Sequence, residues 1–141
     1  MKIFLDTNVI VSAVATRGLC ADVLRETLRS HQLVISEYLI NEVRHVLQKK
    51  IRVPGELADD LIEILKQDAI LSIPESTPDV PVEDKNDLLM LSSALAGKAD
   101  LFVTGDGELL KLAKIEKLEI VSPRRFWEKL RLTPQRRFQK T

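Results

Sequence analysis

The chain of 141 residues alternates short apolar runs with longer stretches in which apolar side chains recur every three or four positions. The short runs are typical of buried strands, and the longer stretches are typical of helices with one apolar face. Strands are predicted at 3–5, 33–35, 69–73, 101–104 and 118–121, and helices at about 19–30, 37–50, 56–67, 86–96, 107–114 and 123–130. This alternation predicts an α/β fold, in which helices cover both faces of a mainly parallel sheet.

Single residues indicate where several of these elements begin and end. The segment after the first apolar run, Asp6-Thr7-Asn8, is interpreted as a polar turn. Ser36 stands where the N-cap of the following helix is expected, and Gly97 stands where a C-terminal glycine would end a helix. In the helix at 56–67, the side chains expected to face the core are those of Leu57, Leu61, Ile64 and Leu65.

Length and composition favour a single cytoplasmic domain. With 45% hydrophobic and 30% charged residues, a chain of this size can bury a core without disulfides. Cys20 is the only cysteine, so no intrachain disulfide can form and a reducing compartment is expected. No apolar run approaches the ~20 residues that span a bilayer, so no membrane association is expected.

The net charge is zero, but the charges are unevenly distributed. Residues 124–141 contain seven Lys or Arg and one acid, so the rest of the chain is acidic. We expect a folded domain at 1–130 and a basic tail at 131–141. The basic segment is a candidate contact for nucleic acid, with its aromatic side chains stacking on bases. The alternative, favoured for Phe126 and Trp127 but not for Phe138, is that these aromatic side chains pack the last helix onto the core.

Acidic residues follow two predicted strands, at the sheet edge where α/β folds bind their ligands. Asp6 directly follows the first strand and Asp106 the fourth, so parallel strands would bring both to one edge. Asp84 and Asp87 open the apolar helix that precedes the fourth strand. Glu42 lies at the border of the apolar stripe of the second predicted helix.

These acids have a structural explanation and a chemical one. Singly, an Asp after a strand can form a turn, an Asp before a helix can be its N-cap, and an acid in the first helical turn interacts favourably with the helix dipole. Together, carboxylates within a few ångströms repel one another, and a bound cation relieves the repulsion. Oxygen-only donors favour Mg²⁺ or Mn²⁺, which can activate a water and stabilise the leaving oxygen of an in-line displacement at phosphorus.

Four segments occur in a fixed order along the chain: Phe4-Leu5-Asp6-Thr7-Asn8-Val9, the pair Ser36 and Glu42, Asp84-Lys85-Asn86-Asp87 before a Leu-rich helix, and Val103-Thr104-Gly105-Asp106. In this order and spacing they resemble the PIN domain family of metal-dependent nucleases, over about residues 2–122. The segments 96–100 and 104–106 are most similar to the toxin components of bacterial toxin–antitoxin pairs, the VapC-like ribonucleases.

The resemblance implies a three-layer fold whose five-stranded sheet has the order 3-2-1-4-5, so that the first and fourth strands are neighbours. It implies that domain 1–130 is the nuclease, with a catalytic and metal-binding quartet formed by Asp6, Glu42, Asp87 and Asp106. Supporting side chains would be Asn8, Ser36 and Thr104. Asp84 is the alternative to Asp87, which we prefer for its position within the helical turn.

The activity implied is that of an endoribonuclease that cleaves single-stranded RNA with Mg²⁺ or Mn²⁺ in the cytoplasm. The implied partners are the RNA substrate and a small antitoxin protein. One or two metal ions, and a monomer or a homodimer, are equally compatible with the resemblance. A role in RNA processing unrelated to toxins also stays open.

Two other interpretations predict different chemistry. A phosphohydrolase with an aspartyl nucleophile also places an Asp after its first strand, but commonly has a second Asp two residues later, where this chain has Asn8. A trapped phospho-aspartate would favour that enzyme. A non-catalytic RNA-binding module would not need the acidic quartet, all of which is present.

Overall fold

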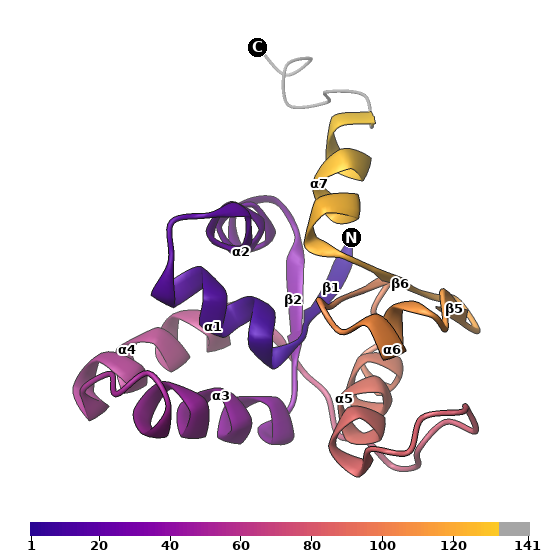
Figure 1. Cartoon of the computed structure of the whole chain (residues 1–141), viewed down its shortest axis with the longest axis horizontal. Coiled ribbons are helices and arrows are strands. Elements are labelled where there is room, and N and C mark those ends of the chain that lie inside the picture. Colours follow the sequence, from indigo (N-terminus) through magenta and orange to yellow (C-terminus); the bar gives the residue numbers. More distant parts are fainter. Residues whose placement is uncertain (133–141) are drawn as a thin grey trace.

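The structure, a computed structural model, describes residues 1–132 and contains one sheet between two groups of helices (Figure 1). The strands are β1 (Lys2–Leu5), β2 (Gln32–Ile35), β3 (Ile70–Leu71), β4 (Leu101–Val103), β5 (Lys114–Ile115) and β6 (Leu118–Val121). The helices are α1 (Thr7–Ala15), α2 (Leu19–Ser30), α3 (Glu37–Lys49), α4 (Gly55–Lys66), α5 (Lys85–Ala96), α6 (Gly107–Leu110) and α7 (Pro123–Leu132). The α/β class predicted from the sequence is confirmed.

The sheet has the strand order β3-β2-β1-β4-β6-β5. All neighbours are parallel except β5, which pairs antiparallel with β6. The predicted fifth strand is β6, so the predicted order is correct for five strands and β5 is an additional edge strand. β5 was missed because its two residues lie in a segment that the apolar pattern assigned partly to a helix, and that helix, α6, already ends at Leu110.

The segment after β1 is a helix and not the predicted turn. α1 begins at Thr7, and the carboxylate of its N-cap, Asp6, accepts a hydrogen bond from the backbone N–H of Thr7 over 2.8 Å. The β-branched run Val9-Ile10-Val11 is buried. Such residues have low helix propensity, so burial against the rest of the core, which the local sequence does not show, stabilises this helix.

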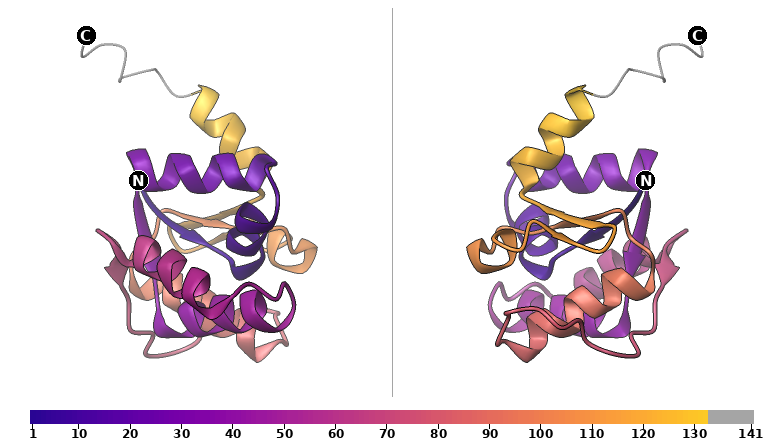
Figure 2. Two further views of the ribbon diagram at one scale, coloured as in Figure 1. Left: turned by 90° about the vertical axis from the view of Figure 1, so that its left-hand side faces the viewer. Right: turned by 90° about the vertical axis from the view of Figure 1, so that its right-hand side faces the viewer.

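The core lies on both faces of the central strands. Phe4 on β1 and Phe102 on β4 are fully buried, and their rings stack with centroids 5.2 Å apart. Figure 2 shows α2 and α7 together above the strands, and α3, α4 and α5 below them. These five helices therefore form the outer two layers of a three-layer domain.

The buried face of α4 differs from the prediction. Its buried side chains are those of Ala58, Ile62 and Leu65, which recur at helical spacing on one face. Leu57 and Ile64, which were expected to face inward, are 58% and 48% exposed. The prediction was wrong for these two positions because it followed the largest apolar side chains, whereas the small Ala58 completes the buried stripe.

The last helix packs onto the domain through its aromatic side chains. Phe126 is fully buried and lies edge-on to His31, and Trp127 is partly buried against the core. The interpretation of these two aromatics as packing residues is confirmed. α7 continues to Leu132, so it includes the first two residues of the predicted tail. The rest of that tail, with Phe138, lies outside the described residues.

No single helix within residues 1–132 is long and apolar enough to cross a membrane. The bent pair α1 and α2, which meet at 108°, satisfies the length and composition criterion only when the two helices are taken together.

Candidate active site

Two central strands bring the first two acids to one edge of the sheet. Leu5 at the end of β1 pairs with Val103 at the end of β4, and the backbone N–H of Asp6 donates to the carbonyl of Val103 over 2.9 Å. Thr104 Oγ1 donates to Asp6 Oδ2 over 2.8 Å and accepts the backbone N–H of Asp106 over 3.0 Å. One buried hydroxyl therefore connects both strand-end acids.

Three of the acids are N-caps of helices that begin at this site. Asp6 caps α1, Asp84 caps α5 and Asp106 caps α6. Asp84 Oδ1 accepts the backbone N–H groups of Asn86 and Asp87, and Asp106 Oδ1 accepts that of Glu108 over 2.8 Å. These three acids are therefore helix N-caps, as the structural explanation predicted, and they also lie close to one another. The helix N-termini offset part of the negative charge that they bring together.

Glu42 reaches the site from α3, and a residue outside the predicted set holds it there. Glu42 is partly buried, and its Oε1 accepts a hydrogen bond from Nδ2 of Asn86 over 3.1 Å. Asn86 belongs to the Asp84–Asp87 segment, but nothing in the local sequence shows that its side chain contacts an acid 44 positions away. The sequence does show that Asn86 lies between Asp84 and Asp87 at a predicted helix start, which was the one local indication that it belongs to the site.

The acids affect one another's protonation. Burial raises the pKa of Asp6, hydrogen bonds from Thr104 and the Thr7 N–H lower it, and the charges of Asp106 and Glu42 raise it further. The pKa of Asp87 is raised to about 6, first by burial and then by the charges of Asp84, Asp106, Asp6 and Glu42. The predicted quartet and Asp84 are therefore close enough to repel one another at neutral pH.

Asp84 and Asp87 are both at the site but have different surroundings. Asp84 is exposed, and one of its carboxylate oxygens accepts two backbone N–H groups of α5. Asp87 is partly buried, and besides this burial the charges of the other four acids raise the pKa of its carboxyl group. Asp87 is therefore the acid of this segment whose charge interacts with the other carboxylates, whereas Asp84 is the residue that starts the helix.

The other predicted supporting residues have different positions. Ser36 is fully buried as the N-cap of α3, where its Oγ accepts the backbone N–H of Leu39 and contacts Ser93 Oγ at 2.7 Å. Its hydroxyl joins the start of α3 to α5. Asn8 is exposed in the first turn of α1, next to Asp6 in sequence.

The chemistry of the donor set fits a hard divalent cation. Asp6, Glu42, Asp87 and Asp106 offer only oxygen atoms, as Mg²⁺ and Mn²⁺ prefer. A cation would relieve the repulsion that, after burial, contributes to the raised pKa values of Asp6 and Asp87. Within residues 1–132 no three acidic, His or Cys side chains already surround one point as metal ligands.

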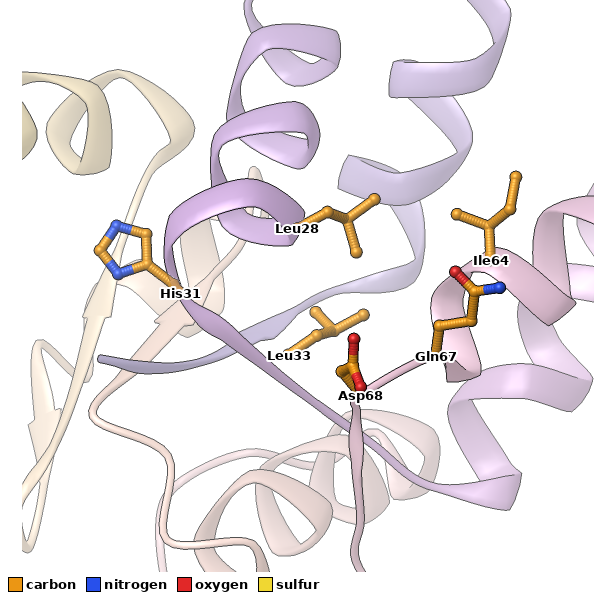
Figure 3. A pocket seen from close by; sticks show the side chains of 6 residues that line it. All are labelled: Leu28, His31, Leu33, Ile64, Gln67 and Asp68. Atoms are coloured by element: carbon orange, nitrogen blue, oxygen red, sulfur yellow. The ribbon is translucent and has the colours of Figure 1, made fainter.

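A cavity of about 100 Å³ lies elsewhere, between the end of α2, the start of β2 and the end of α4 (Figure 3). His31 and Leu33 line it at the amino end of β2, whereas the acids lie at the carboxyl ends of the parallel strands. The cavity is smaller than the ~300 Å³ at which pockets for small organic ligands begin. Because it lies at the opposite edge of the sheet, the cavity is separate from the acidic site.

Fold and site together define an α/β protein with an acidic centre at the carboxyl edge of its parallel sheet. A model of the PIN domain family matches residues 2–108, more than half of the chain. The chain therefore belongs to the PIN domain family, and the resemblance found in the sequence is confirmed. No curated protein shows significant sequence similarity to it.

Solved structures with the same fold include components of VapBC complexes. One is VapBC2 from Rickettsia felis bound to a DNA fragment from their promoter, with a TM-score of 0.62 and 19% identity over 86% of this chain and 98% of that chain. Another is VapBC-1 from nontypeable Haemophilus influenzae, with a TM-score of 0.61 and 20% identity over 88% of this chain and 99% of that chain. At these identities the likeness shows the fold, which extends over almost the whole of each neighbour.

Proposed function

We propose that this protein is a Mg²⁺- or Mn²⁺-dependent endoribonuclease that cleaves single-stranded RNA. The observation that carries the proposal is the gathering of Asp6, Glu42, Asp87 and Asp106 at one sheet edge, where the charges of Asp106 and Glu42 add to the effect of burial in raising the pKa of both Asp6 and Asp87. A cluster of this kind is costly without a cation and useful with one. Membership of the PIN domain family supports the nuclease class.

Each acid has a separate part in the proposed site. Asp6, Asp87 and Asp106 would hold one or two ions, and Glu42 would bind directly or through a water. When bound, the ion supplies an activated water and stabilises the leaving oxygen of an in-line displacement at phosphorus. The protein would hold these ligands in place through hydrogen bonds. The Thr7 N–H donates to Asp6 Oδ1 and the Thr104 hydroxyl to Asp6 Oδ2, each over 2.8 Å.

The start of α7 is the proposed contact for the RNA backbone. The carbonyl of Val121, the last residue of β6, accepts the N–H of Thr104 over 3.0 Å, so β6 ends at the same sheet edge as the acids. Arg124 and Arg125 follow within three to four residues and are exposed. Positive charge beside an acidic centre offsets the repulsion between that centre and RNA phosphates.

The toxin role of the proposed enzyme is supported by its neighbours, which are parts of VapBC complexes. We propose a small antitoxin protein as its partner and the bacterial cytoplasm as its place of action. Expression of the protein alone should slow bacterial growth, and Asp6→Asn should relieve the effect. Equal growth with both forms would favour an RNA-processing nuclease unrelated to toxins.

Cleavage by the purified protein tests the enzymatic proposal. A labelled single-stranded RNA should be cut in Mg²⁺ or Mn²⁺ and remain intact in EDTA. Asp6→Asn, Asp87→Asn and Asp106→Asn should each lower the rate by at least ~10²-fold, the scale at which a main electrostatic contribution is lost. Glu108→Gln, an exposed acid on α6, is the matched control and should cleave at the wild-type rate. Full activity in EDTA would refute metal dependence.

A further inference from the structure

The hydrogen bond between Asn86 and Glu42 connects two helices at the rim of the acidic centre. Asn86 Nδ2 donates to Glu42 Oε1 over 3.1 Å, and the contact is partly buried. A carboxylate can only accept, so the amide must present its N–H₂ group to it. Glu42 is thus held by a side-chain amide of α5, the helix that also carries Asp87.

A second hydrogen bond joins the same two helices farther from the rim. Ser93 Oγ lies 2.7 Å from Ser36 Oγ, and both side chains are fully buried. Ser93 is seven residues after Asn86 on α5, and Ser36 is six residues before Glu42 at the start of α3. These separations correspond to about 10 Å and 9 Å of helix. The helices therefore lie antiparallel, held together at two points of one shared face.

The two hydrogen-bonding groups of Asn86 have separate partners. Its backbone N–H donates to Asp84 Oδ1 over 2.8 Å and belongs to the cap of α5, whereas its side chain donates to Glu42. Because the cap uses only the backbone, it survives a change of the side chain. The contact with Glu42 can therefore be removed while α5 keeps its start.

We propose that Asn86 is a positioning residue, which orients the Glu42 carboxylate toward the divalent cation of the acidic centre. The inference rests on the proposed function, since it concerns a ligand of the same ion. Glu42 is partly exposed on a helix and has three rotatable bonds, so without a partner its carboxylate would sample solvent-facing rotamers. The Asn86 amide instead holds the Glu42 carboxylate against α5. It adds no negative charge to a centre that already contains five acids.

Direct Mn²⁺ binding separates a positioning role from a structural one. Asn86→Ala should weaken Mn²⁺ binding in calorimetric titration by ~10-fold or more, the usual effect of losing a partner that orients a metal ligand. Its melting temperature in EDTA should stay close to that of the wild type. Ser92→Ala is the matched control on α5: Ser92 Oγ donates to the carbonyl of Ser76, away from Glu42, so Mn²⁺ affinity should be unchanged.

A double-mutant cycle shows whether Asn86 acts through Glu42. In the Glu42→Ala background, Asn86→Ala should cause no further loss of Mn²⁺ affinity. Equal losses in the two backgrounds, or wild-type affinity in Asn86→Ala, would overturn the inference while leaving the proposed function intact. A wild-type protein that neither binds Mn²⁺ nor cuts RNA would overturn both.

Discussion

Thr104 Oγ1 donates a hydrogen bond of 2.8 Å to Asp6 Oδ2, although the two residues are 98 positions apart in the sequence. The contact follows from the parallel pairing of β1 with β4, which places the residues after both strands side by side. The same hydroxyl accepts the backbone N–H of Asp106, so it orients the Asp6 carboxylate and fixes the backbone of Asp106 beside it. The sheet register thus determines how Asp6 and Asp106 lie relative to each other.

Thr104→Val should impair both folding and cleavage. It replaces the hydroxyl with a methyl group and leaves the buried Asp6 Oδ2 without its donor, which costs about 1–3 kcal/mol of unfolding free energy. RNA cleavage should fall ~10-fold or more because Asp6 loses its orientation. Thr104→Ser keeps the hydroxyl and should retain most of both properties. Urea unfolding and cleavage rates measure the two effects, and a Val variant equal to the wild type in both would contradict this role.

Asp87→Asn should make the metal-free protein less sensitive to pH. Burial and then the neighbouring acids raise the pKa of Asp87 from 3.8 to about 6. Because the folded-state pKa is the higher one, its favourable contribution to the unfolding free energy is complete below pH ~4 and is lost as the pH rises through about 6. In EDTA the wild type should therefore lose stability relative to Asp87→Asn between pH 4 and 6.

Metal addition provides the control for this prediction. At pH 7.5, Mg²⁺ should raise the melting temperature of the wild type more than that of Asp87→Asn, since a ligand that binds only the folded state shifts the equilibrium. If Asp87 served only the helix dipole, the mutant would instead be ~0.3–1 kcal/mol less stable in EDTA, and both proteins would respond equally to Mg²⁺. That result would remove Asp87 from the ligand set.

Gly97→Ala should destabilise the fold through a steric clash. Gly97 has φ −84°, so its role is not a left-handed conformation. A Cβ atom there would lie 2.3 Å from Val34 Cγ1, where the end of α5 meets β2. Overpacking of this kind costs about 1–3 kcal/mol, measurable by urea unfolding. Gly55→Ala, where the nearest atom is 3.5 Å away, should be close to neutral; equal stability of the two variants would contradict the close approach.

Arg124→Gln combined with Arg125→Gln should weaken RNA binding and reduce its salt dependence. If each arginine contacts one phosphate of a single strand, the slope of log K against log salt should fall by about 1.4. Within residues 1–132 the Arg125 side chain forms one exposed ion pair, with Glu128, so little stability should be lost. Binding is measured in EDTA to prevent cleavage.

The control for the arginine pair is Lys114→Gln with Lys117→Gln, at the edge strand β5 and the turn that follows it. These exposed lysines lie at the end of the sheet order, so their loss should change RNA binding less. Equal effects of the two double variants would indicate a diffuse charge effect rather than a contact at α7.

Much of this site could be predicted because strand order and strand direction are enough to place residues. Asp6 and Asp106 each follow a strand of the same direction, so their proximity needs no side-chain detail. The Asn86–Glu42 contact could not be predicted, since it depends on how α3 and α5 pack against each other. α1 was missed because Val9, Ile10 and Val11 disfavour a helix locally. Gly97 was placed correctly at a helix end, but a glycine is needed there because Val34 leaves no room for a Cβ atom, and not because of the backbone angle.

The chemical ends of the RNA products test the central claim most directly. Displacement by an activated water leaves a linear phosphate and a hydroxyl, whereas attack by the neighbouring 2′-hydroxyl leaves a 2′,3′-cyclic phosphate. We expect the wild type in Mg²⁺ to give only linear ends, and neither the wild type in EDTA nor Asp6→Asn in Mg²⁺ to give products. Cyclic phosphate ends, or the same products from Asp6→Asn, would contradict hydrolysis at the acidic centre.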